Sequence, residues 1–254
     1  SYIFNGAETK TLVIKITANR AGIEGVLRVK AGKGWKTEMQ DAQIRTTARG
    51  EEKLVTVKVT PGENSSQLEA AVEINGKTYR QDIQRISYDH IPYQLILRDA
   101  MVPAIRTEVK TQGGQIAYIP GAGDDVAACL EQIGYKVTLL SDEMLATSDL
   151  SKYSAIVTGV RAYNTNERLQ LHHAKLMRYV KNGGNLVVQY NTNSRVGPLQ
   201  AKTGPYPFTI SRERVTDEKA SITFNLPQHA ALNHPNKITA ADLEGWVQER
   251  GIYF

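Results

Sequence analysis

The periodicity of apolar residues changes once along this chain, and that change limits the folds available to it. From residue 11 to about residue 97, apolar and polar residues mostly alternate, as in the half-buried strands expected at residues 12–17, 25–30, 54–59 and 68–74. Asn75-Gly76 is the strongest turn signal between such runs, since a type I′ hairpin turn needs two residues with positive φ. The pattern predicts an immunoglobulin-like antiparallel β-sandwich over residues 1–98, with Trp35 between its sheets.

Residues 99–114 interrupt the alternation and predict a linker ending at Gly113-Gly114. After this linker the spacing of apolar residues changes, so a second domain is expected. Strand-like and helix-like runs then follow each other, which implies βαβ crossovers and a parallel sheet with helices on both faces. The expected strands are 116–119, 136–140, 154–159 and 185–190, and the expected helices are 124–134 and 166–181. We therefore expect an α/β domain over residues 115–254.

Both ends of the sequence suggest a piece of a longer chain. There is no initial methionine and no signal-peptide pattern, and the last four residues resemble the start of a strand. We therefore expect the α/β domain to be truncated at its C-terminus.

Composition argues against several functional classes. The net charge is +5, but the 31 Lys and Arg residues are interleaved with 26 Asp and Glu, so no basic face for nucleic acid is predicted. One cysteine excludes an internal disulfide and a Cys-rich zinc site. No apolar run is long enough for a membrane helix.

Gly121 and Gly123 follow an expected strand and resemble the opening of a dinucleotide-binding fingerprint. Val126 stands where the third glycine belongs, and Asp124 and Asp125 place carboxylates where a pyrophosphate would lie. Capping of the following helix by these aspartates explains them better.

Neither a metal site nor a catalytic residue is predicted. The adjacent His172 and His173 point about 100° apart on a helix and do not share one metal easily. Tyr190 and Asn191 stand at the strand-to-helix turn where a nucleophile would be expected, and Cys129 is expected to be a buried helical thiol.

Polar residues collect after the strands that end near residues 119, 159 and 190. The carboxyl ends of parallel strands form the usual ligand site of such sheets. Amide, phenol and guanidinium groups there suit sugars, peptides or a protein surface, and strand termination and helix capping explain the same residues equally well. The candidate ligand-binding residues are Asp124, Asp125, Arg161, Tyr163, Asn164, Asn191, Thr192 and Arg195.

Residues 113–254 also resemble a known family. The resemblance rests on the runs at 119–126, 132–138, 159–169 and 179–191, with Gly204-Pro205-Tyr206-Pro207-Phe208 and residues 245–251. Together these runs resemble the C-terminal region of large bacterial PIG-L (LmbE-like) family deacetylases, especially those of Bacteroidetes.

The resemblance implies a flavodoxin-like, class I glutamine amidotransferase-like α/β domain, preceded by a β-sandwich of a type associated with carbohydrate-active enzymes. It also implies an N-terminal zinc-dependent deacetylase domain, whose His-Pro-Asp-Asp-Glu signature this chain lacks, so no cofactor is expected here and zinc only there. Tyr190 and Asn191 replace the nucleophilic cysteine of the amidotransferases.

The resulting expectation is a non-catalytic accessory region of an exported, periplasmic N-acetylglucosamine deacetylase-type protein. Its expected partners are glycans or the deacetylase domain of the same parent chain, and simple scaffolding is a further role. The alternatives are a degenerate or incomplete hydrolase that uses the polar rim, and a small-molecule sensor.

Overall fold

The computed structural model describes residues 1–192, 202–211, 215–217 and 219–245. The chain divides into two compact units, unit 1 from Ser1 to Val109 and unit 2 from Lys110 to Phe254. Most of the regular structure is β-sheet, and a parallel sheet stands apart from the others. Among the described residues, no helix combines the length and the apolar character that a membrane span requires.

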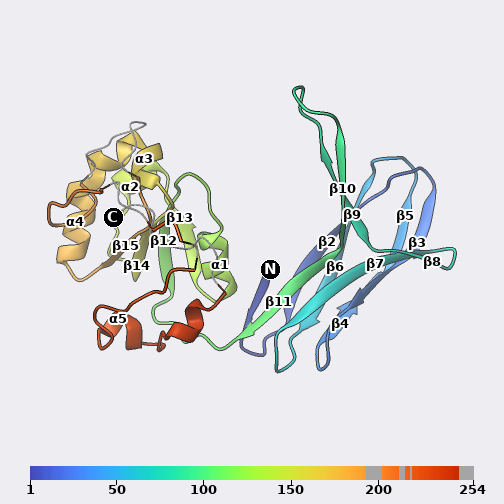
Figure 1. Cartoon of the computed structure of the whole chain (residues 1–254), viewed down its shortest axis with the longest axis horizontal. Helices are drawn as coiled ribbons and strands as arrows, with labels where there is room; N and C mark the ends of the chain where they lie inside the picture. Colours follow the sequence, from blue (N-terminus) through green and yellow to red (C-terminus); the bar gives the residue numbers. More distant parts are fainter. Residues whose placement is uncertain (193–201, 212–214, 218, 246–254) are drawn as a thin grey trace. The chain divides into compact units, whose positions relative to one another are not determined.

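Unit 1 contains a mixed sheet, an antiparallel sheet and a projecting hairpin (Figure 1). The mixed sheet has the order β1 (Tyr2–Asn5), β11 (Met101–Thr107), β7 (Ser66–Ile74), β3 (Ile23–Lys30) and β5 (Gln43–Thr46), with β8 (Lys77–Tyr79) also paired to β7. Only its β1–β11 pair is parallel. The antiparallel sheet has the order β2 (Lys10–Thr17), β6 (Glu52–Thr60) and β4 (Lys36–Met39), and the hairpin joins β9 (Gln81–Ile86) to β10 (Gln94–Asp99).

The two larger sheets of unit 1 share a core, as the alternating pattern predicts. Val57 and Val59 of β6 pack with Leu68 of β7 and with Phe4 of β1. Trp35 lies in this core, where its ring meets the Phe4 ring edge-on at 4.9 Å and its indole N–H donates to the Asn64 carbonyl at 2.8 Å. The expected position of Trp35 is therefore confirmed.

The boundary between the units differs from the expected linker at residues 99–114. Residues 101–107 form β11, a full member of the mixed sheet, so that the expectation of an irregular connector is wrong there. Pro103 made this stretch look unlike a strand, because proline cannot donate to a ladder. β11 tolerates it because pairing with β1 begins only at Ala104, so the Pro103 position is paired on the β7 side alone.

Unit 2 is built around a parallel four-stranded sheet. Its order is β13 (Lys136–Leu139), β12 (Gln115–Ile119), β14 (Ala155–Thr158) and β15 (Asn185–Val188). The helices are α1 (Val126–Gln132), α2 (Asp142–Thr147), α3 (Ala162–Thr165), η1 (Glu167–His172), α4 (His173–Lys181), α5 (Ala230–Asn233) and η2 (Ala240–Leu243). The alternation of strands and helices along residues 115–188 agrees with the sequence prediction, except that α2 between β13 and β14 was not among the expected helices.

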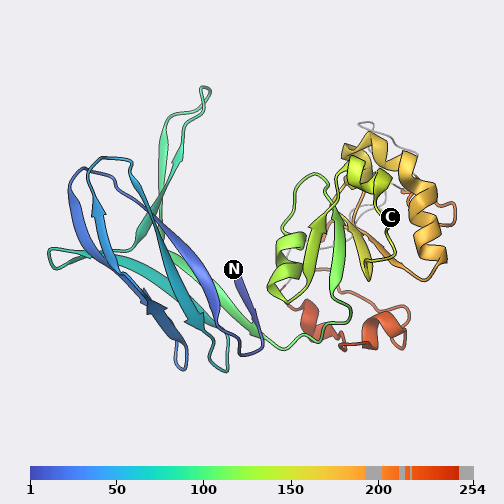
Figure 2. The same cartoon turned by 180° about the vertical axis from the view of Figure 1, so that it is seen from behind.

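Helices cover both faces of the central strands (Figure 2). On β12, Ala117 and Ile119 face a core that includes Leu145 of α2 and Leu176 of α4. The alternate residues of β12, including Tyr118, face α1. Because successive side chains of a strand point to opposite faces, a doubly covered strand reads as continuously apolar, as the run at residues 116–119 does.

Candidate functional site

The order of the parallel sheet reverses between β12 and β14, and this is where open α/β sheets usually bind ligands. The segments that follow β12, β14 and β15 meet at this point. The Ala122 amide donates to the Val160 carbonyl at 2.7 Å, and the Arg161 amide donates to the Tyr190 carbonyl at 2.7 Å. The structure therefore brings together the three segments singled out in the sequence.

Two glycines make this close approach possible. A Cβ on Gly121 would lie 2.1 Å from the Val160 carbonyl oxygen, and one on Gly159 would lie 2.7 Å from the Gly121 nitrogen. Both glycines thus allow the loops after β12 and β14 to contact each other through their backbones. Gly121, which resembled part of a phosphate-binding loop, is explained by this contact.

Asp124 joins the loops through its carboxylate. Oδ1 accepts the Val126 amide at 2.9 Å and the Tyr118 hydroxyl, while Oδ2 accepts the Val160 amide at 3.0 Å. Burial alone raises the pKa of Asp124, but these hydrogen bonds outweigh it and lower the pKa below its ordinary value. The Asp124 carboxylate therefore accepts the amide at the start of α1 that a bound phosphate would otherwise use.

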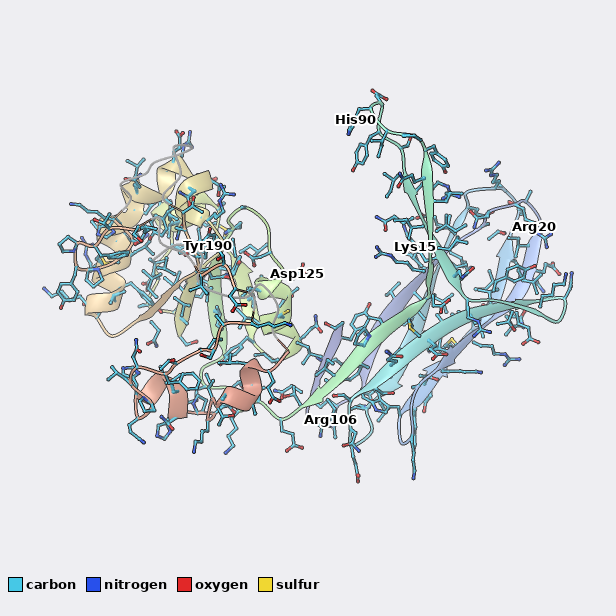
Figure 3. The ribbon with its side chains drawn as sticks, in the orientation of Figure 1. Lys15, Arg20, His90, Arg106, Asp125 and Tyr190 are labelled. Atoms are coloured by element: carbon cyan, nitrogen blue, oxygen red, sulfur yellow. The ribbon has the colours of Figure 1, made fainter. Side chains whose placement is uncertain are left out.

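Asp125 behaves differently from its neighbour. It is the N-cap residue of α1, its side chain is exposed, and it makes no capping hydrogen bond. Figure 3 labels Asp125 and also Tyr190, which is the second residue after β15 and is 38% exposed. The capping explanation thus applies to Asp124, which accepts the Val126 amide, and not to Asp125.

Tyr118 and Gln189 belong to the same cluster, although neither was a candidate. The Gln189 amide donates to the Tyr118 hydroxyl at 3.1 Å, and that hydroxyl donates to Asp124. Burial, followed by the bond to Asp124, raises the pKa of Tyr118. The sequence signal for Tyr118 was a tyrosine within an apolar strand. A buried phenol usually has a hydrogen-bond partner, so a polar neighbour for Tyr118 could have been expected.

Asn164, Asn191 and Thr192 form a buried brace between α3 and the segment after β15. Asn164 donates to the Thr192 carbonyl at 3.0 Å and accepts the Thr192 amide at 2.8 Å. Asn191 accepts the Tyr163 amide at 3.1 Å and donates to the Gln189 carbonyl at 2.8 Å. Each of the three side chains is less than one-tenth exposed, so the amides are turned toward the chain and not toward solvent.

Tyr163 and Arg161 keep polar atoms without partners among the described residues. The Tyr163 side chain is 1% exposed, and burial raises its pKa to about 12. Arg161 is half-buried with a left-handed backbone (φ 57°), and its Nε lacks a partner. Arg195, the remaining candidate, lies outside the described residues.

The residues considered for metal binding and nucleophilic chemistry were His172, His173 and Cys129. His172 ends η1 and His173 begins α4, and among the described residues no three His, Cys, Asp or Glu side chains gather as a metal site would require. The expectation of a buried Cys129 is wrong, because the thiol is exposed on α1. Val126, Ala127 and Leu130 provide the face of α1 that packs on the sheet.

Comparison with known proteins gives little further guidance. No family model matches the sequence, and no curated protein matches it. One solved structure, described as "Structure of WR4, a C. elegans MSP family member", is 10% identical with a TM-score of 0.24 and covers 42% of this chain and 91% of its own. That similarity is too low to carry an argument about fold or function.

Proposed function

We propose that this chain is a non-catalytic accessory region of an exported PIG-L (LmbE-like) N-acetylglucosamine deacetylase-type protein, in which unit 2 has a scaffolding role. One observation carries the proposal: the Asp124 carboxylate and the side-chain amides of Asn164 and Asn191 at the strand ends are bonded to the chain itself. Asp124 accepts three donors, and the Asn164 and Asn191 amides each accept and donate.

A ligand at this position would have to compete with these internal bonds. Leaving a buried donor or acceptor unpaired costs about 1–3 kcal/mol. Engaging Asn164 with a ligand would leave both the amide and the carbonyl of Thr192 unpaired. The chain therefore gains more from these side chains as internal braces than as ligand-binding groups.

The fold adds support of a more general kind. The sheet order β13-β12-β14-β15 corresponds to the first four strands of a flavodoxin-like order, which the class I amidotransferase resemblance implies. The two sheets of unit 1 with a shared core suit an immunoglobulin-like sandwich, as in modules that accompany carbohydrate-active enzymes. Function does not follow from fold alone, so the proposal depends on the bonded state of the strand ends.

A degenerate hydrolase is the second candidate, and the unpartnered Tyr163 hydroxyl and Arg161 Nε favour it. A buried phenol without a partner can act on a bound substrate only if the substrate reaches it. Its pKa of about 12 makes it a donor at neutral pH and not a base.

Hydrolysis assays with the whole chain distinguish the two. We expect no acetate release from chitooligosaccharides and no ester cleavage above the buffer rate, with or without added zinc. Under the hydrolase alternative, saturable turnover is lost in Tyr163→Phe and Arg161→Ala and kept in the control Tyr206→Phe, whose side chain is 79% exposed. That pattern would refute the accessory role.

A further inference from the structure

Unit 1 contains a large groove beside strand β2. Its volume is about 1340 Å³, and its walls are β2, inward-facing residues of β3 and β7, and the β9–β10 hairpin. Small-molecule pockets usually measure about 300–1000 Å³, so this groove suits a larger occupant. In Figure 3 the labelled Lys15 marks β2, and His90 marks the tip of the hairpin.

The groove runs along the edge of β2 and extends inward to core residues of the two sheets, including Val57 and Val59 of β6. Every residue from 12 to 20 lines it, although successive side chains of a strand point to opposite faces. Within the described part of the chain, β2 pairs as a strand with β6 alone, so its other edge at residues 12–17 presents backbone donors and acceptors toward the groove. Proteins usually protect such an edge, and the eight residues of β2 carry charges only at Lys10 and Lys15.

The hairpin supplies an apolar wall opposite this edge. Leu97 lies opposite Ile83 in the β9–β10 register, and both residues line the groove. Leu97 is 56% exposed, although it is a large apolar residue. An extended chain between β2 and the hairpin would cover such side chains with its own alternate side chains.

Charge indicates what kind of chain fits. The basic lining residues are Lys15, Arg20, Arg80, Arg85 and Arg98, and the acidic ones are Glu69, Asp82 and Asp99. The lining thus has five basic and three acidic residues. Lys15 is paired with Glu52, which reduces the basic excess, whereas the bond from Arg85 to the neutral Asn19 leaves the Arg85 charge in place. A second copy bound symmetrically would place the same basic groups against each other, so electrostatics favour a different partner.

We propose that this groove binds an extended acidic segment of another protein, with apolar side chains at alternate positions, which adds as a strand to the free edge of β2. In this mode the backbone bonds of the added strand provide affinity, and the apolar wall selects its alternate side chains. The proposal goes beyond the accessory role of unit 2 and does not depend on it, because it concerns unit 1 alone.

The test uses the whole chain and a synthetic peptide, Glu-Glu-Val-Thr-Val-Thr-Val-Thr-Val-Glu-Glu, with blocked ends. We expect saturable binding by calorimetry and slower hydrogen exchange at the β2 amides when the peptide is present. Leu97→Asp should weaken binding by about 10-fold, because it replaces the exposed apolar surface that the peptide would cover with a charge that repels the acidic peptide. The matched control is Leu54→Asp, since Leu54 is 63% exposed on β6 and does not line the groove.

Charge reversal tests the electrostatic part of the proposal. Arg98→Glu should weaken binding and reduce its salt dependence, whereas Arg49→Glu, an exposed change outside the groove, should leave both unchanged. Three results would overturn the proposal. They are no binding at about 1 mM peptide, equal binding by the Leu97→Asp and Leu54→Asp variants, and self-association in ultracentrifugation that Leu97→Asp abolishes while the peptide does not compete.

Discussion

The close contact between the loops after β12 and β14 predicts a large effect for Gly121→Ala. The new Cβ would lie 2.1 Å from the Val160 carbonyl oxygen, where ordinary contact begins at 3.4 Å, so the loops must separate by about 1.3 Å. The obstacle is backbone and cannot rotate away. Overpacking of this kind costs about 1–3 kcal/mol, and we expect the upper end of that range.

The same displacement should be visible locally. Separation of the loops lengthens the bond from the Ala122 amide to the Val160 carbonyl, now 2.7 Å, so exchange of that amide should accelerate. For a unit of about 150 residues, a loss of about 3 kcal/mol corresponds to a fall in Tm of roughly 6–12 °C. Circular dichroism gives the Tm, and hydrogen exchange gives the local opening.

Gly114→Ala is the matched control for this experiment. A Cβ at Gly114 would meet nothing within 4 Å, so the change should alter stability by no more than about 0.5 kcal/mol. If Gly121→Ala melts within about 2 °C of the wild type, and its Ala122 amide exchanges at the wild-type rate, the proposed contact between the loops is wrong.

Three further outcomes test the strand-end cluster. Tyr163→Phe should raise the free energy of unfolding by up to about 1 kcal/mol, because it removes a buried hydroxyl without a partner; a loss of stability in urea titrations would show that the hydroxyl is bonded. Asn164→Ala should cost about 2–4 kcal/mol in the same titrations, since it leaves the Thr192 amide and carbonyl unpaired, and an unchanged midpoint would refute the brace. Because the folded pKa of Asp124 is lowered, its stabilising contribution is present above its ordinary pKa of 3.8 and is lost as pH falls through the folded value. Asp124→Asn should therefore be less stable than wild type at pH 7, and the difference should shrink as pH falls below 3.8; a constant difference from pH 7 to pH 2 would contradict this.

Local signals predicted the parts of the fold that depend on local chemistry. Asn75 and Gly76 have φ values of 48° and 76°, and they form the turn between β7 and β8 that their sequence indicated. Trp35 could be assigned to the core because a large aromatic residue between strands needs burial. The strand β11 could not be recognised in the same way, since its tolerance of Pro103 depends on the stagger between its two partners.

At the candidate site, too, the sequence predicted the features that follow from topology and missed the contacts that form only in the folded chain. Strand ends and glycines located the convergence of three segments correctly, because the topology of a parallel sheet places successive carboxyl ends at one edge. The sequence could not show that Asn164 would bond to the backbone of Thr192, since the two are 28 residues apart and meet only in the folded chain. Residue type alone therefore cannot separate a ligand-binding amide from a bracing amide.

The free edge of β2 illustrates why an accessory region can bind without a conventional pocket. A side chain at a strand-end site can bind a ligand only if it is not already hydrogen-bonded within the protein. Asp124 and Asn164 are both hydrogen-bonded internally. An edge strand meets no such competition, because about half of its backbone groups point away from the strand it pairs with, which for β2 is β6 among the described residues. In unit 1, the outer edge of β2 at residues 12–17 thus offers backbone groups for an added strand, beside the exposed Leu97 of the hairpin.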